Sequence, residues 1–320
     1  MVKKLENLKW KPMWVSHLGC IKGCLDYLEI DISDAWLFGA TGHAFIINIA
    51  KKEVCPSGPT AWHTEKMFEL GKNIGYEIDG VFSHKQKPDF VPTRKKAWEL
   101  VKKSIDKGIP CYGWELGVPE FYVVNGYDDV GYYYSGALAD PTKMPLPWEK
   151  LADTKIGVIE MYSVKSGKPA DDIFTIKQAF EFVLEHAKSP EKWIFPNYRA
   201  GLDGFDIWIK TLEQGDANEH GMAYNTEVWH ECRYFAVEFL KQAKERLDKK
   251  YGPMLDEAIT HYDLVARNLK RVEELYPFHT RKPGYTKDKI RIKKAVEALK
   301  AARNAEESGL KSLAKIVNAL

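Results

Sequence analysis

The sequence predicts an α+β protein, with a mixed first domain over residues 1–169 and an all-α second domain over residues 170–320. Two observations support this fold class. Between residues 109 and 164, four short runs rich in β-branched and aromatic residues are joined by turns, which favours an antiparallel sheet over β-α-β units. Beyond Pro169, apolar residues recur at helical spacing and no strand is evident.

The first predicted helix begins at His17, and the Ser16 side chain is expected to cap it by accepting a backbone N–H. One face of this helix carries apolar residues at spacings of three and four, namely Leu18, Ile21, Leu25 and Leu28. Cys20 and Cys24 lie on an adjoining face. A second cap at residues 33–34 opens a short helix, and the residues from His43 to Ile49 are expected to form a buried strand.

The middle of the first domain alternates helices and strands. A loop over residues 51–59 contains Cys55 and precedes a helix around residues 62–70. A strand is expected over residues 73–82, and Thr93 is expected to cap an amphipathic helix that runs to Lys107. Further strands are predicted over residues 109–115, 120–127, 131–135 and 155–164.

The second domain is predicted from caps and apolar stripes. Helices are expected from residue 171 or 175 to about residue 187, through Trp208 and Leu212, and over residues 218–251, 253–275 and 288–320. The aromatic stripe from Trp229 to Phe239 is typical of a core between helices. His230 lacks the second histidine, four residues away, that a zinc-binding helix needs, so neither a metal nor a cofactor is expected.

The composition indicates a soluble globular protein with ample core, since 45% of its 320 residues are hydrophobic. Its net charge of +2 gives no indication of nucleic-acid or membrane partners. The N-terminal residues are too polar for a signal peptide, and the apolar stretch at residues 35–50 is too short to span a bilayer. With five cysteines and no CxxC pair, the sequence predicts a cytoplasmic protein with free thiols.

Cys20 is the best-placed candidate nucleophile. A thiol near the start of a helix feels the positive end of the helix dipole, which favours the thiolate. Cys24 is one turn further along, and Cys55, just before another helix, is a weaker candidate. The alternative is structural, because a free cysteine commonly packs as a small buried hydrophobic residue.

Two stretches resemble a known family. The cysteine-bearing helix with Trp36-Leu37-Phe38-Gly39 after it, and the segment GVPEFYVVNGYDDVGYYYSGALADP, resemble papain-fold enzymes of the bacteriocin-processing peptidase type. The resemblance is closest to the N-terminal domain family of the butirosin biosynthesis acyltransferase. The helical tail, with residues 198–201 and 224–233, is similar to the C-terminal region of such proteins. The resemblance implies a papain-like first domain.

In that family, a helix cysteine attacks an acyl carbon, a histidine acts as base, and an acid orients the histidine. The resemblance assigns the nucleophile to Cys20, the orienting acid to Asp140 and the histidine position to Glu120. Counting back from Tyr27 at the family's spacing gives Ser16 for the nucleophile instead. Because Glu120 is not a histidine, His17 or His43 is the alternative base, with Glu115, Glu120 or Asp140 as the acid.

Two functions follow as expectations. The first is a thiol-dependent acyl or amide transferase or hydrolase acting on a small acyl, amino-acid or peptide substrate, with an acyl carrier as a candidate donor. The second is a catalytically inactive papain-like domain that binds a small molecule or peptide, which the glutamate at position 120 favours. Helical packing in the second domain also suggests a homodimer.

Overall fold

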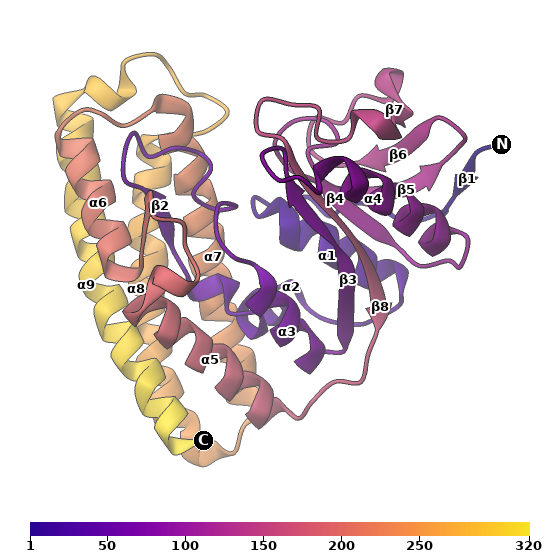
Figure 1. Ribbon diagram of the computed structural model, residues 1–320. Coiled ribbons are helices and arrows are strands. Elements are labelled where there is room, and N and C mark those ends of the chain that lie inside the picture. The colour runs from indigo at the N-terminus through magenta and orange to yellow at the C-terminus, as the bar shows by residue number, and fades with distance from the viewer. The chain divides into compact units, whose positions relative to one another are not determined.

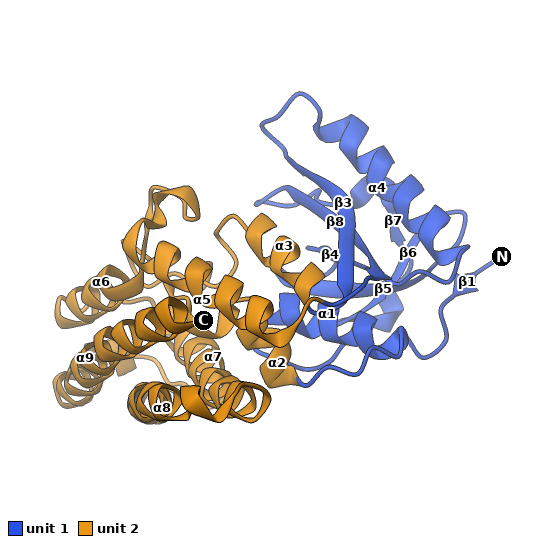
Figure 2. Cartoon of the chain, turned by 90° about the horizontal axis from the view of Figure 1, so that it is seen from below, with its two compact units in different colours: residues 1–33, 74–169 blue, residues 34–73, 170–320 orange.

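The computed structural model describes residues 1–320, which form two compact units. The first unit comprises residues 1–33 and 74–169, and the second comprises residues 34–73 and 170–320 (Figure 2). One boundary between the units lies at the expected position, after Pro169. The segment 34–73, expected in the first domain, belongs to the second unit because its helices and strand pack against later parts of the chain.

The first unit contains a seven-stranded sheet in the order β3-β8-β4-β5-β6-β7, with β1 paired to β5 (Figure 1). Every pairing in it is antiparallel, which confirms the predicted sheet type. The strands are β1 (Lys3–Lys4), β3 (Tyr76–His84), β4 (Cys111–Trp114), β5 (Phe121–Tyr127), β6 (Gly131–Ser135), β7 (Leu146–Pro147) and β8 (Val158–Ser166).

Two helices cover this sheet. Helix α1 (Ser16–Tyr27) packs against β4, β5 and β8, and helix α4 (Phe90–Ile105) packs against β3, β5 and β8. Figure 2 shows them on opposite faces of the sheet. The expected cap of α4 at Thr93 is wrong, because the helix begins one turn earlier, after Asp89, and Thr93 is buried within its first turn.

The second unit is mostly helical. Its helices are α2 (Asp34–Ala40), α3 (Glu65–Asn73), α5 (Asp172–Lys188), α6 (Gly201–Glu213), α7 (Glu219–Arg246), α8 (Gly252–Leu275) and α9 (Lys289–Ala319). The long helix α8 packs against both α7 and α9. The Asn218 side chain caps α7 by accepting the Gly221 N–H at 2.8 Å, and the Asp288 side chain caps α9 by accepting the Ile290 N–H at 2.9 Å.

Two expectations for the second unit are wrong. The unit is not all-α, because β2 (Asn48–Ala50) pairs with β9 (Tyr198–Ala200) in a separate two-stranded sheet. His43 does not open a strand, since His43–Phe45 is a short 3₁₀ helix that follows Gly42. Gly42 has a φ of 76°, a left-handed backbone that ends α2 and turns the chain before β2.

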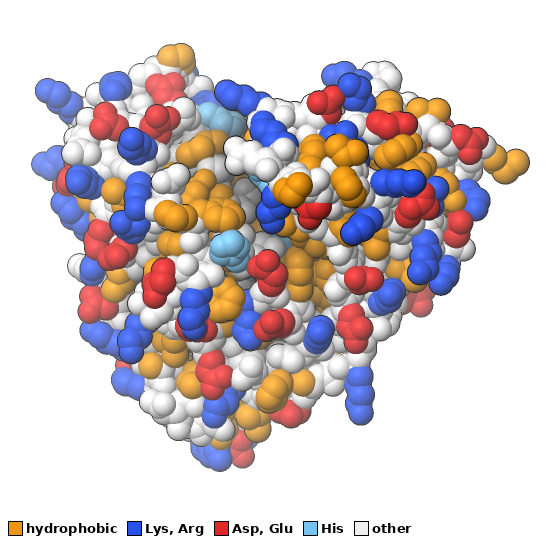
Figure 3. All heavy atoms as spheres, viewed as in Figure 1, with side chains coloured by type: hydrophobic (Ala, Val, Ile, Leu, Met, Phe, Trp, Pro, Cys, Tyr) orange, Lys and Arg blue, Asp and Glu red, His pale blue; other side chains and the backbone are white.

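Charges of both signs are interspersed over the face drawn in Figure 3, with Lys and Arg side chains beside Asp and Glu side chains. This mixture agrees with the nearly balanced total of 47 basic and 45 acidic residues. None of the helices combines the length and the apolar composition needed to cross a membrane.

Candidate functional site

The Ser16 hydroxyl connects the start of α1 to the start of β5. Ser16 is the first residue of the helix, and Val15 occupies the capping position without a side-chain hydrogen bond. The Ser16 hydroxyl donates a hydrogen bond to the Glu120 carboxylate and accepts one from the Phe121 backbone N–H at 3.2 Å. The expected capping role of Ser16 is therefore wrong, because its side chain is bonded across to the sheet.

The connection between β4 and β5 holds Glu120 in place. The Glu115 N–H donates to the Glu120 carbonyl at 3.0 Å and closes the connection. The Tyr122 hydroxyl accepts from the Val118 N–H at 2.8 Å and donates to the Ala137 carbonyl at 2.9 Å. These hydrogen bonds fix the backbone on both sides of Glu120, and so they hold its side chain in position.

Glu115 is strained and nearly inaccessible. Its φ of 61° lies in the left-handed region that a non-glycine residue rarely adopts, and its side chain is only 4% exposed. Its Oε2 atom is buried and makes no hydrogen bond. Backbone strain of this kind is concentrated at functional sites, and here it lies at the end of the connection that carries Glu120.

The His17 side chain is directed at the sheet rather than at a thiol. His17 Nε2 lies 3.0 Å from the Tyr112 hydroxyl, and its ring stacks on Phe121 with centroids 3.9 Å apart. Burial raises the pKa of Tyr112 well above its ordinary value, so this phenol keeps its proton. His17 therefore has the contacts of a core residue, although its predicted role as a base is not tested by them.

Cys20 is completely buried in the second turn of α1. Burial raises the pKa of its thiol well above the ordinary value, and the nearby Cys24 and Glu120 add to the increase. Burial likewise raises the pKa of Cys24. Desolvation thus outweighs the expected effect of the helix dipole, and both thiols are protonated at neutral pH.

The Asp140 carboxylate bonds to neighbouring residues of its own turn. Its carboxylate accepts hydrogen bonds from the Thr142 hydroxyl at 2.7 Å and the Thr142 N–H at 3.0 Å, and it lies 3.5 Å from the Lys143 ammonium. The hydrogen bonds from Thr142 hold the pKa of Asp140 below its ordinary value. In this structure, Asp140 caps a turn and does not orient a histidine.

His43 belongs to the second unit, whereas Cys20 belongs to the first. Its Nδ1 atom lies 3.6 Å from the Cys232 Sγ atom, and its side chain is only 2% exposed. Burial lowers the pKa of His43 to about 4, so the imidazole is neutral at neutral pH. The partner that the structure gives to His43 is therefore Cys232, which sequence reasoning did not connect with it.

Cys55, in the second unit, is the one thiol that is not buried. Its Sγ atom accepts a hydrogen bond from the Ser57 hydroxyl at 3.0 Å, and that hydroxyl lies 2.7 Å from the Tyr198 hydroxyl. The other four cysteines have little or no exposed surface. By accessibility alone, Cys55 is the thiol that reagents reach first.

No three His, Cys, Asp or Glu side chains gather closely enough to hold a metal ion. His230, considered as a ligand, instead lies with its Nδ1 atom 2.5 Å from a Glu273 carboxylate oxygen. His230 is thus paired with a carboxylate and does not belong to a coordination sphere.

The residues that the structure brings together are Ser16 and Glu120. Sequence reasoning reached each of them separately, through the family spacing counted from Tyr27 and through the strand position of the family histidine. It did not predict their hydrogen bond, which joins residues 104 positions apart. Taken together, these two family positions place Ser16 where the nucleophile lies and Glu120 where the histidine lies. This coincidence is the sequence signal that could have predicted the pair.

Comparison with known proteins leaves the family open. No protein-family model matches the chain. No curated protein matches its sequence either.

Proposed function

We propose that the first unit is a papain-like domain that binds a small molecule or peptide and performs no thiol chemistry. The observation that carries this proposal is the hydrogen bond from Ser16 to Glu120. The family's spacing counted back from Tyr27 gives Ser16 for the nucleophile, in place of the Cys20 that the resemblance otherwise assigns, and the family's histidine position falls on Glu120. A serine and a glutamate there give a polar, hydrogen-bonded pair in place of a thiolate and an imidazole.

The state of Cys20 supports the same proposal. A cysteine nucleophile must be exposed to its substrate and must ionise, and the thiolate is the reactive form. Cys20 is fully buried, and its pKa is raised by that burial. Thiol-dependent acyl transfer at Cys20 stays a prediction, and it requires a rearrangement of α1 that exposes this side chain.

A second candidate function is acyl transfer by the Ser16 hydroxyl. The observation that favours it is that Ser16 already donates its proton towards a carboxylate and lies in the first turn of a helix. A nucleophile and a base within hydrogen-bonding reach are the minimum arrangement for such chemistry. It is the weaker candidate, because a carboxylate is a poorer base for a hydroxyl at neutral pH than the imidazole that the family uses.

Ligand-induced stabilisation tests the binding proposal. The full-length protein is heated with panels of amino acids, short peptides and acyl-carrier thioesters, and a ligand at 100 times its Kd is expected to stabilise it by about 2.7 kcal/mol. Glu120→Gln should abolish the response, whereas Cys20→Ala should keep it. Glu149→Gln, which removes the same charge from an exposed site in the same unit, is the matched control.

Covalent labelling separates the binding proposal from the two catalytic candidates. Incubation with an activated ester, followed by intact mass measurement and peptide mapping, should reveal no acyl group on the protein. An acyl group on Cys20 would establish thiol chemistry, and one on Ser16 would establish the serine candidate. A panel that produces no stabilisation, with Glu120 intact, would contradict the binding proposal.

A further inference from the structure

We infer that the turn between α8 and α9, together with the start of α9, is a docking surface for an anionic phospholipid bilayer. The segment concerned, residues 279–294, is called the basic segment below. It contains seven Lys and Arg residues and one acidic residue, Asp288. This inference concerns the second unit and does not depend on the ligand site proposed for the first.

The basic segment concentrates positive charge that the whole-chain total conceals. The chain has 47 Lys and Arg against 45 Asp and Glu, so the other 304 residues carry 40 against 44. The segment therefore has a net charge of +6 on an otherwise acidic molecule. Clusters of four to eight Lys and Arg residues are typical of surfaces that bind anionic lipids.

The seven cations of the segment have no carboxylate partners. Arg281, Lys287 and Arg291 donate hydrogen bonds to backbone carbonyls, those of Phe278, Gly215 and Leu275 respectively. The other four side chains form neither hydrogen bonds nor ion pairs and are exposed, namely Lys282, Lys289, Lys293 and Lys294. Their charges are therefore available to an external anion.

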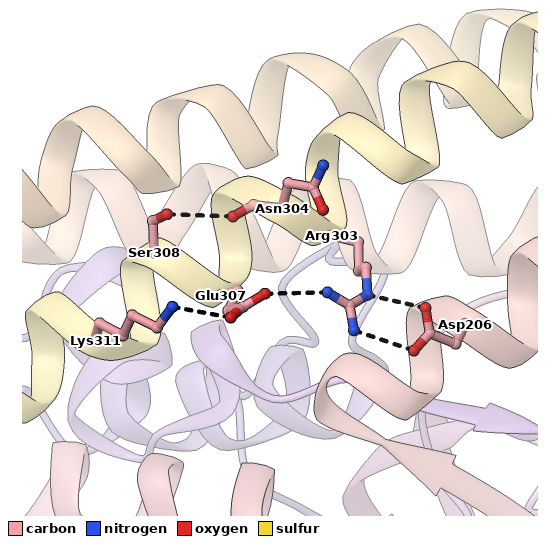
Figure 4. A network of polar contacts seen from close by, with 6 residues as sticks. All are labelled: Asp206, Arg303, Asn304, Glu307, Ser308 and Lys311. Carbon is pink, nitrogen blue, oxygen red and sulfur yellow. Dashed lines mark hydrogen bonds and ion pairs between the residues drawn. The ribbon is translucent and has the colours of Figure 1, made fainter.

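Many cations elsewhere on the helices of this unit pair with carboxylates. Further along α9, Arg303 bonds to Asp206 at 2.9 Å and to Glu307 at 3.2 Å, and Lys311 bonds to Glu307 at 2.9 Å (Figure 4). Lys244 on α7 pairs with Asp256 at 2.6 Å. Single unpaired lysines such as Lys188 and Lys210 also occur on these helices, whereas the basic segment gathers four of them between residues 282 and 294.

The one carboxylate in the basic segment is already engaged. The Asp288 side chain accepts the Ile290 and Arg291 N–H groups at 2.9 and 3.1 Å, so it serves the helix start. Thr286 is only 2% exposed and anchors the turn. The turn is therefore an ordered platform on which lysines are displayed.

An apolar side chain lies among these lysines. Ile290, between Lys289 and Arg291, is 71% exposed. A bilayer offers both lipid phosphates for the lysines and an acyl boundary for such a residue. A nucleic acid would instead use free aromatic faces for stacking, but the Arg291 guanidinium lies 3.7 Å from the Tyr285 ring centroid, and Arg281 lies 4.8 Å from that of Phe278. These observations favour the bilayer.

Vesicle binding tests the inference with the full-length protein. Co-sedimentation is measured with vesicles of phosphatidylcholine alone and of phosphatidylcholine with phosphatidylserine. Binding is expected only to the second kind, and it should weaken when the salt concentration is raised, because exposed charges are screened. Replacing the four unpaired lysines by glutamine should reduce the affinity by about fivefold each, or at least about 100-fold together.

A matched variant controls for total charge. Lys241, Lys244, Lys311 and Lys315 are also exposed, but each pairs with a carboxylate at 2.6–2.9 Å. Replacing these four by glutamine removes the same charge and should change vesicle affinity by less than about fivefold. Equal losses in the two quadruple variants, with both still folded by circular dichroism, would overturn the inference.

Two further measurements identify the partner. Ile290→Ser should weaken vesicle binding by about threefold, since it removes an apolar contact and no charge. Binding to single- or double-stranded oligonucleotides in the absence of binding to phosphatidylserine vesicles would overturn the inference in favour of a nucleic acid. Absence of binding to vesicles at low salt would also overturn it.

Discussion

Arg233 on α7 and Glu306 on α9 form a two-bond ion pair in the interior of the second unit. The Arg233 Nε and Nη2 atoms donate to the two carboxylate oxygens of Glu306 at 2.9 and 2.8 Å, and neither side chain is more than 1% exposed. Arg233 Nη1 also donates to the Ala44 and Ile46 carbonyls at 2.8 and 2.9 Å. A single guanidinium therefore joins α7, α9 and the chain between α2 and β2.

Removing one partner of this pair should be costly. Glu306→Ala leaves the Arg233 charge buried without compensation, and we expect the free energy of unfolding to fall by about 3–5 kcal/mol. Urea denaturation followed by circular dichroism measures the change. Asp206→Ala, which removes the partner of the partly exposed Arg303, is the control and should cost at most about 1 kcal/mol. A loss below about 1 kcal/mol for Glu306→Ala would show that the buried charge finds another partner.

Gly39 on α2 should not tolerate a side chain. A Cβ atom placed there would lie 1.9 Å from the Phe239 ring on α7, so Gly39→Ala must displace the ring or the helix. We expect a loss of about 1–3 kcal/mol in the free energy of unfolding. The control is Gly252→Ala at the start of α8, where the nearest atom is 3.8 Å away. Similar stabilities for the two variants would contradict the close packing of α2 on α7.

The stability of the second unit should fall in acid because of two buried histidines. Burial lowers the pKa of His43 to about 4 and that of His186 to about 3. Below pH 6.5, the pKa of a histidine in the unfolded chain, these two histidines bind protons in the unfolded state but stay neutral in the folded protein. The free energy of unfolding is therefore unaffected above about pH 6.5 and decreases as the pH falls towards 4, by roughly 1.4 kcal/mol per pH unit for each histidine.

Denaturation at a series of pH values tests this dependence. His186→Phe should reduce the slope of the free energy of unfolding against pH, between pH 6 and pH 4.5, by roughly 1.4 kcal/mol per pH unit, which corresponds to one proton. His186 suits this replacement because its Nε2 atom is buried without a hydrogen bond and its neighbours include the Trp62 and Phe182 rings. His261→Gln, on a side chain that is 27% exposed, should leave the slope unchanged. An unaltered slope in His186→Phe would refute the assignment to this residue.

Thiol labelling should distinguish Cys55 from the other cysteines. We expect one alkylated residue in the native protein and five after unfolding, because four thiols are buried. Burial also raises the pKa of Cys111 to about 12, so the deeper thiols are protonated as well as hidden. Peptide mapping by mass spectrometry, with Cys55→Ser as the control, measures the order of reaction. If Cys20 were alkylated as fast as Cys55, Cys20 would again be a candidate nucleophile.

Local signals in the sequence predicted most helices and the central strands well. The Gly131–Ser135 strand has the predicted bounds, and α9 begins one residue after the Asp288 cap. Such features depend on a few neighbouring residues, so they can be derived from them. The same reasoning failed for Ser16. Its hydroxyl could cap α1 or bond to the sheet, and the partner that it bonds to, Glu120, is 104 positions away in the sequence.

Long-range packing explains the remaining errors. Nothing near residues 48–50 indicates that this strand pairs with residues 198–200, so the assignment of segment 34–73 to the second unit was missed. His43 and Cys232 likewise meet across 189 positions. The balanced charge of the whole chain also concealed the basic segment, because a total carries no information on distribution.

The division of the chain has a consequence for its synthesis. The segment 34–73 leaves the ribosome early, but its partners β9 and α7 are completed only at residues 200 and 246. At 5–20 residues per second, residues 34–73 wait on the order of 10 seconds or more for them. During that interval the apolar side chains of α2 and β2 lack their native contacts with α7 and β9, so a nascent chain stalled between residues 169 and 200 should be a preferred client for chaperones.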